Sequence, residues 1–183
     1  TAVVFETGNT SEISITFDSS AQKIVIAYQD SSNSYYGTAI VGSVSGTSIT
    51  FGTAVVFESA TTSVTSIAYD STSNKVVIAY RDESGSNYGT AIVGTVSSTS
   101  ISFGTAVVFA SVYTSFISAV SSGGTVVICY QDYPAGNYGK AITGTVSGTS
   151  ISFGTAVVFE SANTRDITST YDANSQKVVI AYR

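Results

Sequence analysis

Three loops of the sequence carry residue types that could bind a ligand. They read QDSSNSYYG at residues 29–37, RDESGSNYG at 81–89 and QDYPAGNYG at 131–139. Each holds an acid, an amide and a Tyr-Gly pair, which gives Asp30, Asn33 and Tyr36, then Asp82, Asn87 and Tyr88, then Asp132, Asn137 and Tyr138. Aromatic faces with carboxylate and amide oxygens suit a sugar, and the oxygens alone suit calcium. The loops predict a binding rim if they share one side of the fold.

The same residues also have a structural interpretation. Asp and Asn side chains accept hydrogen bonds from nearby backbone N–H groups in turns, and a tyrosine before glycine can pack one repeat against the next. The loop bodies differ between copies whereas their frames do not, which is typical of recognition loops on a fixed scaffold. Both interpretations are kept, and no metal ligand is assigned.

The sequence offers little for catalysis. It contains no His, Met or Trp, which excludes Ser-His-Asp, Cys-His and His-zinc sites. Most acids recur once per repeat, and the charged residues that break the pattern are Glu12, Glu83, Arg165 and Asp166. We expect no enzymatic activity and no required cofactor. A glycoside hydrolase stays an alternative, because the separation of two carboxylates is not legible in a sequence.

The loops belong to a repeat of about fifty residues, the signature of a repeat architecture. The segment FGTAVVF begins at Phe51, Phe103 and Phe153, with spacings of 52 and 50 residues. In the second copy, four strand-like stretches are TSIAYD ending at Asp70, KVVIAYRD ending at Asp82, YGTAIVGTVS from Tyr88, and SISFGTAVVFAS ending at Ser111. Their Val, Ile, Thr, Tyr and Phe content and the Ser, Asn and Gly between them predict strands and turns, with no helix.

Four short strands per copy cannot bury both of their faces alone, so neighbouring copies must supply the cover. We therefore predict an all-β fold of tandem four-stranded antiparallel repeats, as blades of a β-propeller, with a β-solenoid as the alternative. The expected single repeat domain, part of a larger chain, divides into a last strand at 1–10, blades at 11–60, 61–110 and 111–160, and two first strands at 161–183.

Three local features predict parts of the core and of one turn. The stretch VVIAY is continuously apolar, so Val77 and Ile78 should lie in a strand that is covered on both faces. Cys129 stands where the other copies have Ala, which predicts a buried and inert thiol. The third copy reads VSSGGT at 120–125, where the Gly-Gly pair allows a tighter hairpin.

Composition excludes two partner classes. The chain has seven Lys and Arg against twelve Asp and Glu, a net charge of -5, which argues against a phosphate backbone as ligand. No apolar run approaches the ~20 residues of a membrane helix, so we expect no membrane insertion.

The segments KVVIAYRD at 75–82 and YGTAIVGTVSSTSISFGTAVVF at 88–109 resemble the repeats of propeller-type proteins in phage tail fibres and in large secreted proteins of marine bacteria. The resemblance is one of repeat style and spans essentially the whole chain. It implies a scaffold for attachment, located extracellularly, at the cell surface or on a virion. The chain lacks the Ser-x-Asp-x-Gly-x-Thr-Trp box of sialidase-like propellers and the Gly-His and Trp-Asp marks of WD40 repeats.

The sequence therefore predicts a module that recognises a surface glycan or protein through its inter-strand loops. The alternatives are a purely structural part of an appendage or virion and a polysaccharide-active enzyme. A homo-oligomer is a further expected partner state.

Overall fold

The computed structural model describes residues 2–183, so Thr1, where a strand was expected to begin, lies outside the described residues. The strands are β1 (Thr10–Asp18), β2 (Lys23–Asp30), β3 (Tyr36–Ser45), β4 (Ser48–Phe51), β5 (Val55–Asp70), β6 (Lys75–Asp82), β7 (Tyr88–Ser97), β8 (Ser100–Phe103), β9 (Val107–Ser122), β10 (Thr125–Asp132), β11 (Tyr138–Ser147), β12 (Ser150–Phe153), β13 (Val157–Glu160), β14 (Thr168–Asp172) and β15 (Lys177–Ala181). The all-β prediction is confirmed. Within residues 2–183, no helix could cross a membrane.

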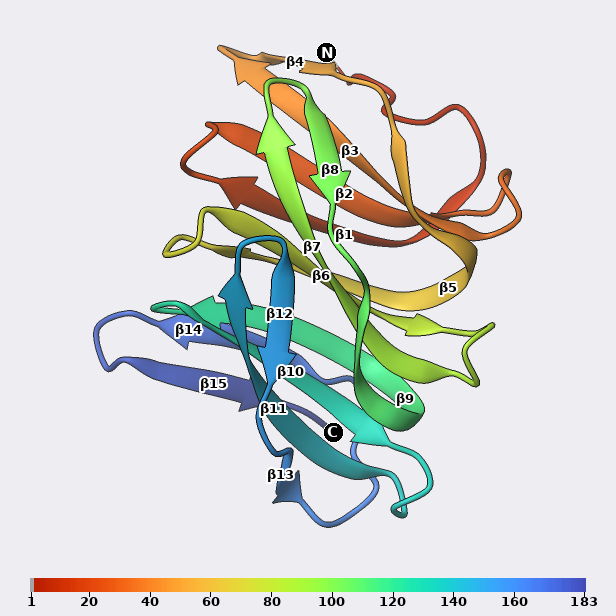
Figure 1. Ribbon diagram of the computed structural model, residues 1–183, viewed down its shortest axis with the longest axis vertical. Coiled ribbons are helices and arrows are strands. Elements are labelled where there is room, and N and C mark those ends of the chain that lie inside the picture. Colours follow the sequence, from red (N-terminus) through yellow and green to blue (C-terminus); the bar gives the residue numbers. More distant parts are fainter. Residues whose placement is uncertain (1) are drawn as a thin grey trace.

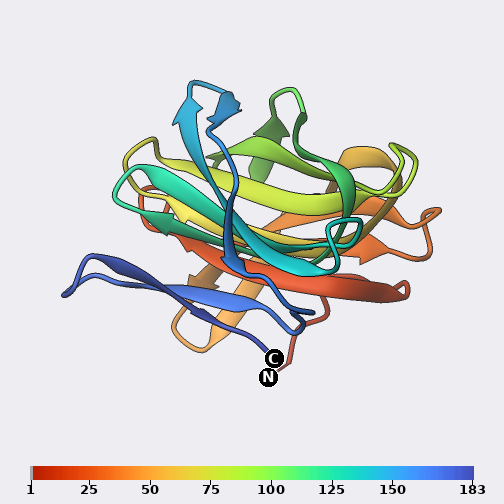
Figure 2. The same ribbon diagram turned by 90° about the horizontal axis from the view of Figure 1, so that it is seen from below.

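All strand pairs are antiparallel. Thirteen strands form one open sheet in the order β1-β2-β3-β5-β6-β7-β9-β10-β11-β12, with β4, β8 and β13 attached to it, and β14 pairs with β15 in a separate hairpin. Figure 1 shows that this sheet folds into successive units stacked along the long axis, with the N-terminus near the top and the C-terminus towards the bottom. Seen from below, the units overlie one another (Figure 2).

Two 16-residue strands join the units. The first part of β5, Val55–Thr61, pairs with β3, and the second part, Thr62–Asp70, pairs with β6. β9 divides in the same way between β7 and β10. We therefore define the first unit as β1 to β4 with the start of β5, the second and third units by the equivalent strands, and the fourth as β14 and β15. The expected boundary at residue 60 thus falls inside one continuous strand.

The expected fourth strand of each unit is interrupted. In the second unit, β8 ends at Phe103 and β9 begins at Val107, and both pair with β7. A Cβ on the intervening Gly104 would lie 1.8 Å from the carbonyl oxygen of Thr149, in the next unit's hairpin. Residues 2–9, expected to hold a last strand, form no strand. The equivalent segments further along the chain, in β5, β9 and β13, pair with the third strands β3, β7 and β11.

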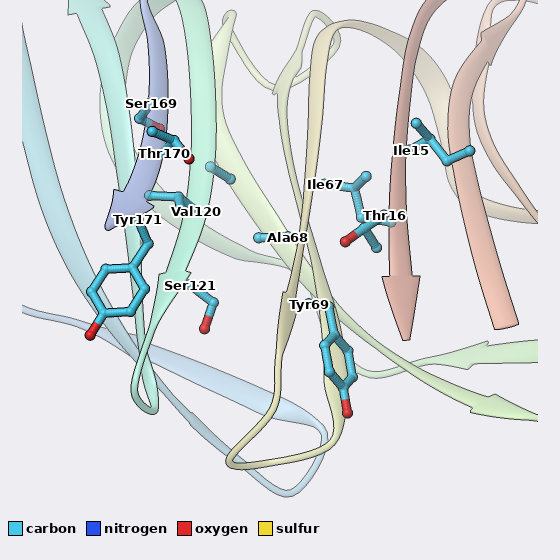
Figure 3. A pocket seen from close by; sticks show the side chains of 11 residues that line it. Ile15, Thr16, Ile67, Ala68, Tyr69, Val120, Ser121, Ser169, Thr170 and Tyr171 are labelled. Carbon is cyan, nitrogen blue, oxygen red and sulfur yellow. The ribbon is translucent and has the colours of Figure 1, made fainter. Parts of the chain in front are cut away.

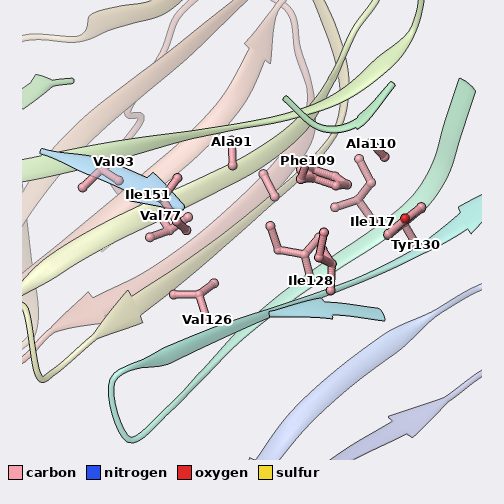
Figure 4. Packing of buried hydrophobic residues seen from close by; sticks show 12 residues of the cluster. Val77, Ala91, Val93, Phe109, Ala110, Ile117, Val126, Ile128, Tyr130 and Ile151 are labelled. Carbon is pink, nitrogen blue, oxygen red and sulfur yellow. The ribbon is translucent and has the colours of Figure 1, made fainter. Parts of the chain in front are cut away.

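The core lies between the units. Val77 and Ile78 are both fully buried, but they point to opposite neighbours, since Val77 packs with Ile128 of the third unit and Ile78 packs with Val25 of the first. Figure 4 shows the cluster around Val77 between the second and third units. The predicted two-sided cover of this strand is confirmed, and it comes from both adjacent units.

The first strands β1, β5 and β9 each carry a bulge that turns a hydroxyl towards the next unit. The bulge residues Glu12, Val64 and Phe116 have φ of 52°, 53° and 49°, and Asp166, just before β14, has a φ of 52°. A left-handed backbone is strained for valine, so surrounding contacts must hold it. Two residues beyond these three bulge residues, Ser14, Ser66 and Ser118 accept the backbone N–H groups of Ile67, Ala119 and Ser169 at 3.1, 2.9 and 2.9 Å. These hydrogen bonds tie successive first strands together.

The expected Gly-Gly turn and the buried thiol are both confirmed. Gly123 and Gly124 join β9 to β10 with φ of 57° and 92°, which only glycine adopts freely. Cys129 is free and fully buried. Burial raises the pKa of its thiol to about 11, so the thiolate is suppressed at neutral pH.

Alkaline pH is expected to destabilise this fold. Burial raises the pKa of Tyr130 to about 12, from an ordinary value of 10.0, and that of Cys129 from 9.0 to about 11. Because both folded values lie above the unfolded ones, the stability is complete below about pH 9 and is lost as pH rises through about 9 to 12. Urea unfolding at a series of pH values would measure this decline.

The variant Cys129→Ala tests the assignment, because Ala occupies the matching positions Ala27, Ala79 and Ala181. The stability of this variant should begin to fall at a higher pH, nearer to pH 10, where tyrosine in the unfolded chain starts to ionise. An unfolding free energy that stays constant from neutral pH to about pH 12 would contradict the prediction.

Candidate functional site

The three candidate loops lie along one side of the molecule. They connect β2 to β3, β6 to β7 and β10 to β11, and the hairpins that follow each first strand lie on the opposite side (Figure 1). The arrangement follows from the repeat, because the second strand of every unit runs in the same direction. The structure therefore brings the predicted loops to a common rim.

The three loop aspartates close their own turns. Asp30 Oδ1 accepts the backbone N–H groups of Ser32 and Asn33 at 3.0 and 3.1 Å. In the second loop, Asp82 Oδ1 accepts those of Ser84 and Gly85 at 3.0 and 2.9 Å. In the third, Asp132 accepts the N–H of Ala135 at 3.1 Å and pairs with Lys140 Nζ at 2.6 Å. These contacts correspond to the structural interpretation of the acids.

The loop amides do not form one equivalent set. Asn87 and Asn137 both have a φ of 63°, and their backbone carbonyls accept N–H groups of the next unit, from Thr114 at 3.2 Å and Thr164 at 3.0 Å. In the first loop Tyr35, with a φ of 61°, takes this position and accepts the N–H of Thr62 at 3.1 Å. Asn33 instead accepts the N–H of Tyr36. The grouping of Asn33 with the other two amides came from composition and not from equivalent position.

The repeated tyrosines Tyr36, Tyr88 and Tyr138 begin β3, β7 and β11 and are half-buried. They lie opposite Asp30, Asp82 and Asp132 in the strand register. The glycine after each tyrosine is required by packing. A Cβ on Gly89 would lie 2.5 Å from the ring of Phe109. The Tyr-Gly frame therefore marks the place where a phenylalanine ring packs against the backbone.

A second group of residues, from β6, β9 and two of the loops, does not recur in the other units. Tyr113 and Tyr133 are 37% and 60% exposed, with ring centroids 5.3 Å apart and planes inclined at 52°. The guanidinium carbon of Arg81 lies 4.8 Å from the centre of the Tyr113 ring, and Arg81 pairs with Glu83 at 3.0 Å. We call Arg81, Glu83, Tyr113 and Tyr133 the tyrosine platform.

The charged pair of the platform is held in place by the strands beneath it. Arg81 also donates to the carbonyl of Thr114 at 3.3 Å, and Glu83 Oε1 accepts the hydroxyl of Ser63 at 2.7 Å. The hydrogen bond from Ser63, together with Arg81, lowers the pKa of Glu83, so its carboxylate is charged at neutral pH. The platform therefore offers the exposed ring of Tyr133, the ring of Tyr113 with Arg81 over it, and a fixed anion and cation beside them.

Sequence reasoning singled out Glu83 but missed both tyrosines. Position 113 is Thr61 in the first unit and Asn163 in the third, and position 133 is Ser31 and Glu83 in the other loops. The sequence signal that could have revealed this site is that both tyrosines differ from the residues at the matching positions of the other units. They become neighbours because the N–H of Tyr133 bonds to the carbonyl of Tyr113 at 3.1 Å.

The other charged residues that break the repeat do not join the platform. Glu12 occupies the bulge of β1, and Asp166, just before β14, pairs with Arg183 at 3.0 Å. Arg165 exchanges backbone hydrogen bonds with Arg183. Within residues 2–183, no group of three or more acidic or cysteine side chains could hold a metal ion.

An open groove runs across the first strands of all four units. It has a volume of about 470 Å³ and is lined by parts of β1, β5, β9 and β14. Tyr69 and Tyr171 project to the same side of it (Figure 3), and the Tyr69 hydroxyl already bonds to Asn74 at 3.1 Å and to the N–H of Ser20 at 3.2 Å. None of the residues that line the groove has a charged side chain.

Comparison with known proteins shows a shared fold only. No family model matches the chain, and no curated protein matches it. Among solved structures it is similar to an exo-β-1,3-galactanase from Phanerochaete chrysosporium, crystallised with β-1,3-galactotriose, at 11% identity and a TM-score of 0.54. The match covers 82% of this chain and 35% of the enzyme chain, so this chain spans about a third of that enzyme. The likeness supports an all-β fold that also occurs in a carbohydrate-active protein.

Proposed function

We propose that this chain is a glycan-binding module whose four-stranded units are blades of a β-propeller, and that it binds its ligand at the tyrosine platform. The observation that carries the proposal is the exposed, non-repeating Tyr113–Tyr133 pair beside the Arg81–Glu83 pair. Exposed aromatic rings at a site where a repeat breaks its own pattern mark recognition more strongly than the repeated loop frame does.

The chemistry of the platform fits a sugar. The apolar face of a pyranose ring packs on a tyrosine ring, and its hydroxyls need donors and acceptors at the edge. Tyr133, which is 60% exposed, presents a ring face for one sugar, and the edge of the Tyr113 ring lies beside it. Arg81 supplies donors and Glu83 an acceptor, and neither has to be ordered when the ligand binds because each is already held by Thr114 or Ser63.

Several observations support binding rather than hydrolysis. Asp30, Asp82 and Asp132 accept hydrogen bonds from their own turns, and Glu83 has a lowered pKa, which is unsuited to a general acid. The likeness to an enzyme crystallised with β-1,3-galactotriose makes that trisaccharide the first probe. We further propose an extracellular, cell-surface or virion location, on the resemblance in repeat style to attachment proteins.

The variant Tyr133→Ala should weaken glycan binding about tenfold or more, since a stacked ring contributes on the order of 1.4 kcal/mol. Isothermal titration with β-1,3-galactotriose, preceded by a glycan array run with and without calcium, measures this. The matched control is Tyr35→Asn, which removes an exposed tyrosine from the first loop and inserts the residue found at the equivalent positions 87 and 137. Its affinity should equal that of the unaltered chain.

Two outcomes would count against the proposal. An array without any bound glycan in either buffer would favour the purely structural role. Binding that Tyr133→Ala leaves intact would place the sugar elsewhere on the molecule.

A further inference from the structure

Arg81 makes more contacts than its place in the repeat requires. The residue before each loop acid donates a hydrogen bond to a threonine carbonyl of the next unit, and in the first and third units Gln29 and Gln131 make this bond. A neutral amide is therefore sufficient to join two units at this position. The charge of Arg81 serves two further contacts, since its guanidinium pairs with Glu83 at 3.0 Å and lies over the Tyr113 ring.

Glu83 supplies the acceptor that is lost when arginine replaces glutamine. In the first unit the Ser11 hydroxyl donates to the side-chain oxygen of Gln29 at 2.6 Å. Arginine has no acceptor atom, so the matching hydroxyl of Ser63 donates to Glu83 instead, at 2.7 Å. Glu83 therefore both satisfies Ser63 and neutralises Arg81. The two charged residues add hydrogen-bonding groups to the second loop without adding net charge.

A second cation at the junction between the second and third units is paired as well. Lys140 stands in β11 where β3 and β7 have threonine, and its ammonium group lies 2.6 Å from the carboxylate of Asp132, the residue before Tyr133. The side chains of Lys140 and Asp132 are only 24% and 6% exposed. An anionic sugar would therefore compete with a bound carboxylate for either cation, and it would approach a chain of net charge -5.

We propose that the tyrosine platform selects neutral sugars over acidic ones, and that Glu83 determines this specificity. The inference rests on the proposed function, because it states which glycans the same site takes. A neutral sugar lies on the Tyr133 ring and places its hydroxyls against Arg81 and Glu83, both of which are already held in place. A carboxylate or sulfate at the same place faces the Glu83 carboxylate. That side chain is 35% exposed and cannot turn away without breaking its bonds to Ser63 and Arg81.

Glu83→Ser tests the proposal, and it inserts the residue that the first loop has at the matching position 31. The probes are matched pairs on a glycan array, each a neutral oligosaccharide beside the same oligosaccharide with one primary hydroxyl oxidised to a carboxylate. Isothermal titration with the β-1,3-galactotriose pair measures affinities for the full chain. The unaltered chain should bind the neutral probe about tenfold more tightly than the acidic one. Glu83→Ser should prefer the acidic probe, because Arg81 is then free to pair with its carboxylate.

Two further variants serve as controls. Glu12→Ser removes the same charge from an exposed residue of β1, away from the platform, and should keep the tenfold preference. The double variant Arg81→Gln/Glu83→Ser reproduces positions 29 and 31 of the first loop, a combination that the fold already accommodates. With both charges gone, it should distinguish the two probes by less than about twofold. Thermal unfolding would show that all three variants are folded.

The outcomes separate this inference from the function on which it rests. An unaltered chain that binds the acidic probes as tightly as the neutral ones would overturn the specificity and leave glycan binding intact. A Glu83→Ser chain that keeps the full preference for neutral probes would do the same. An array on which neutral and acidic oligosaccharides all stay unbound would overturn the proposed function, and the specificity with it.

Discussion

Ile78→Ala is expected to lower the free energy of unfolding by about 2 to 5 kcal/mol. Ile78 is fully buried in β6 and packs with Val25 and Tyr80 between the first two units. Truncation removes apolar area from the core and leaves a cavity that two strand layers on either side cannot easily collapse. Urea unfolding, followed by circular dichroism, would measure the effect.

Val44→Ala is the control for this change, since Val44 lies in β3 and is largely exposed. Its effect should stay within about 0.5 kcal/mol. If Ile78→Ala were as mild as Val44→Ala, the assignment of β6 as a strand covered on both faces would be wrong.

The second large effect is expected for Gly104→Ala, at about 3 kcal/mol of lost stability. The new Cβ would lie 1.8 Å from the carbonyl oxygen of Thr149. Because that obstacle is backbone from the hairpin of the third unit, no side-chain rotation can relieve the clash. The second and third units would have to separate.

Gly154→Ala is a control within the same FGTAVVF segment. There the nearest atom to the new Cβ is the Thr143 hydroxyl oxygen at 3.2 Å, and the nearest backbone atom is 3.8 Å away. We expect a change within about 0.5 kcal/mol. Equal melting temperatures for Gly104→Ala and the unaltered chain would show that the units do not pack at this distance.

Much of the fold was predictable because the strands are apolar segments that begin and end at turn residues. KVVIAYRD and YGTAIVGTVS coincide with β6 and β7, and the Gly123–Gly124 hairpin forms as expected. The joining of two expected strands into β5 was not predictable. Nothing in the sequence at residues 59–62 indicates that a single strand pairs first with β3 and then with β6.

The candidate site was predictable in place but not in composition. The loops were found because their frame recurs, yet the frame serves the backbone, with Asp82 closing a turn and Gly89 admitting a ring. The residues that recur in every unit are structural, whereas the two tyrosines of the platform are residues that the other units lack. The role of the Gln or Arg before each loop acid was not predictable, because its partner carbonyl lies 33 residues further along the chain.

The strands shared between units also bear on how the protein can fold during synthesis. The first part of β5 pairs with β3, and the second part waits for β6, so the first unit is complete once residue 61 has left the ribosome. The second part of that strand can then pair with β6 as soon as β6 has been made. Each unit can therefore form on the one before it, in the order of synthesis, because the strands that pair are close in the sequence.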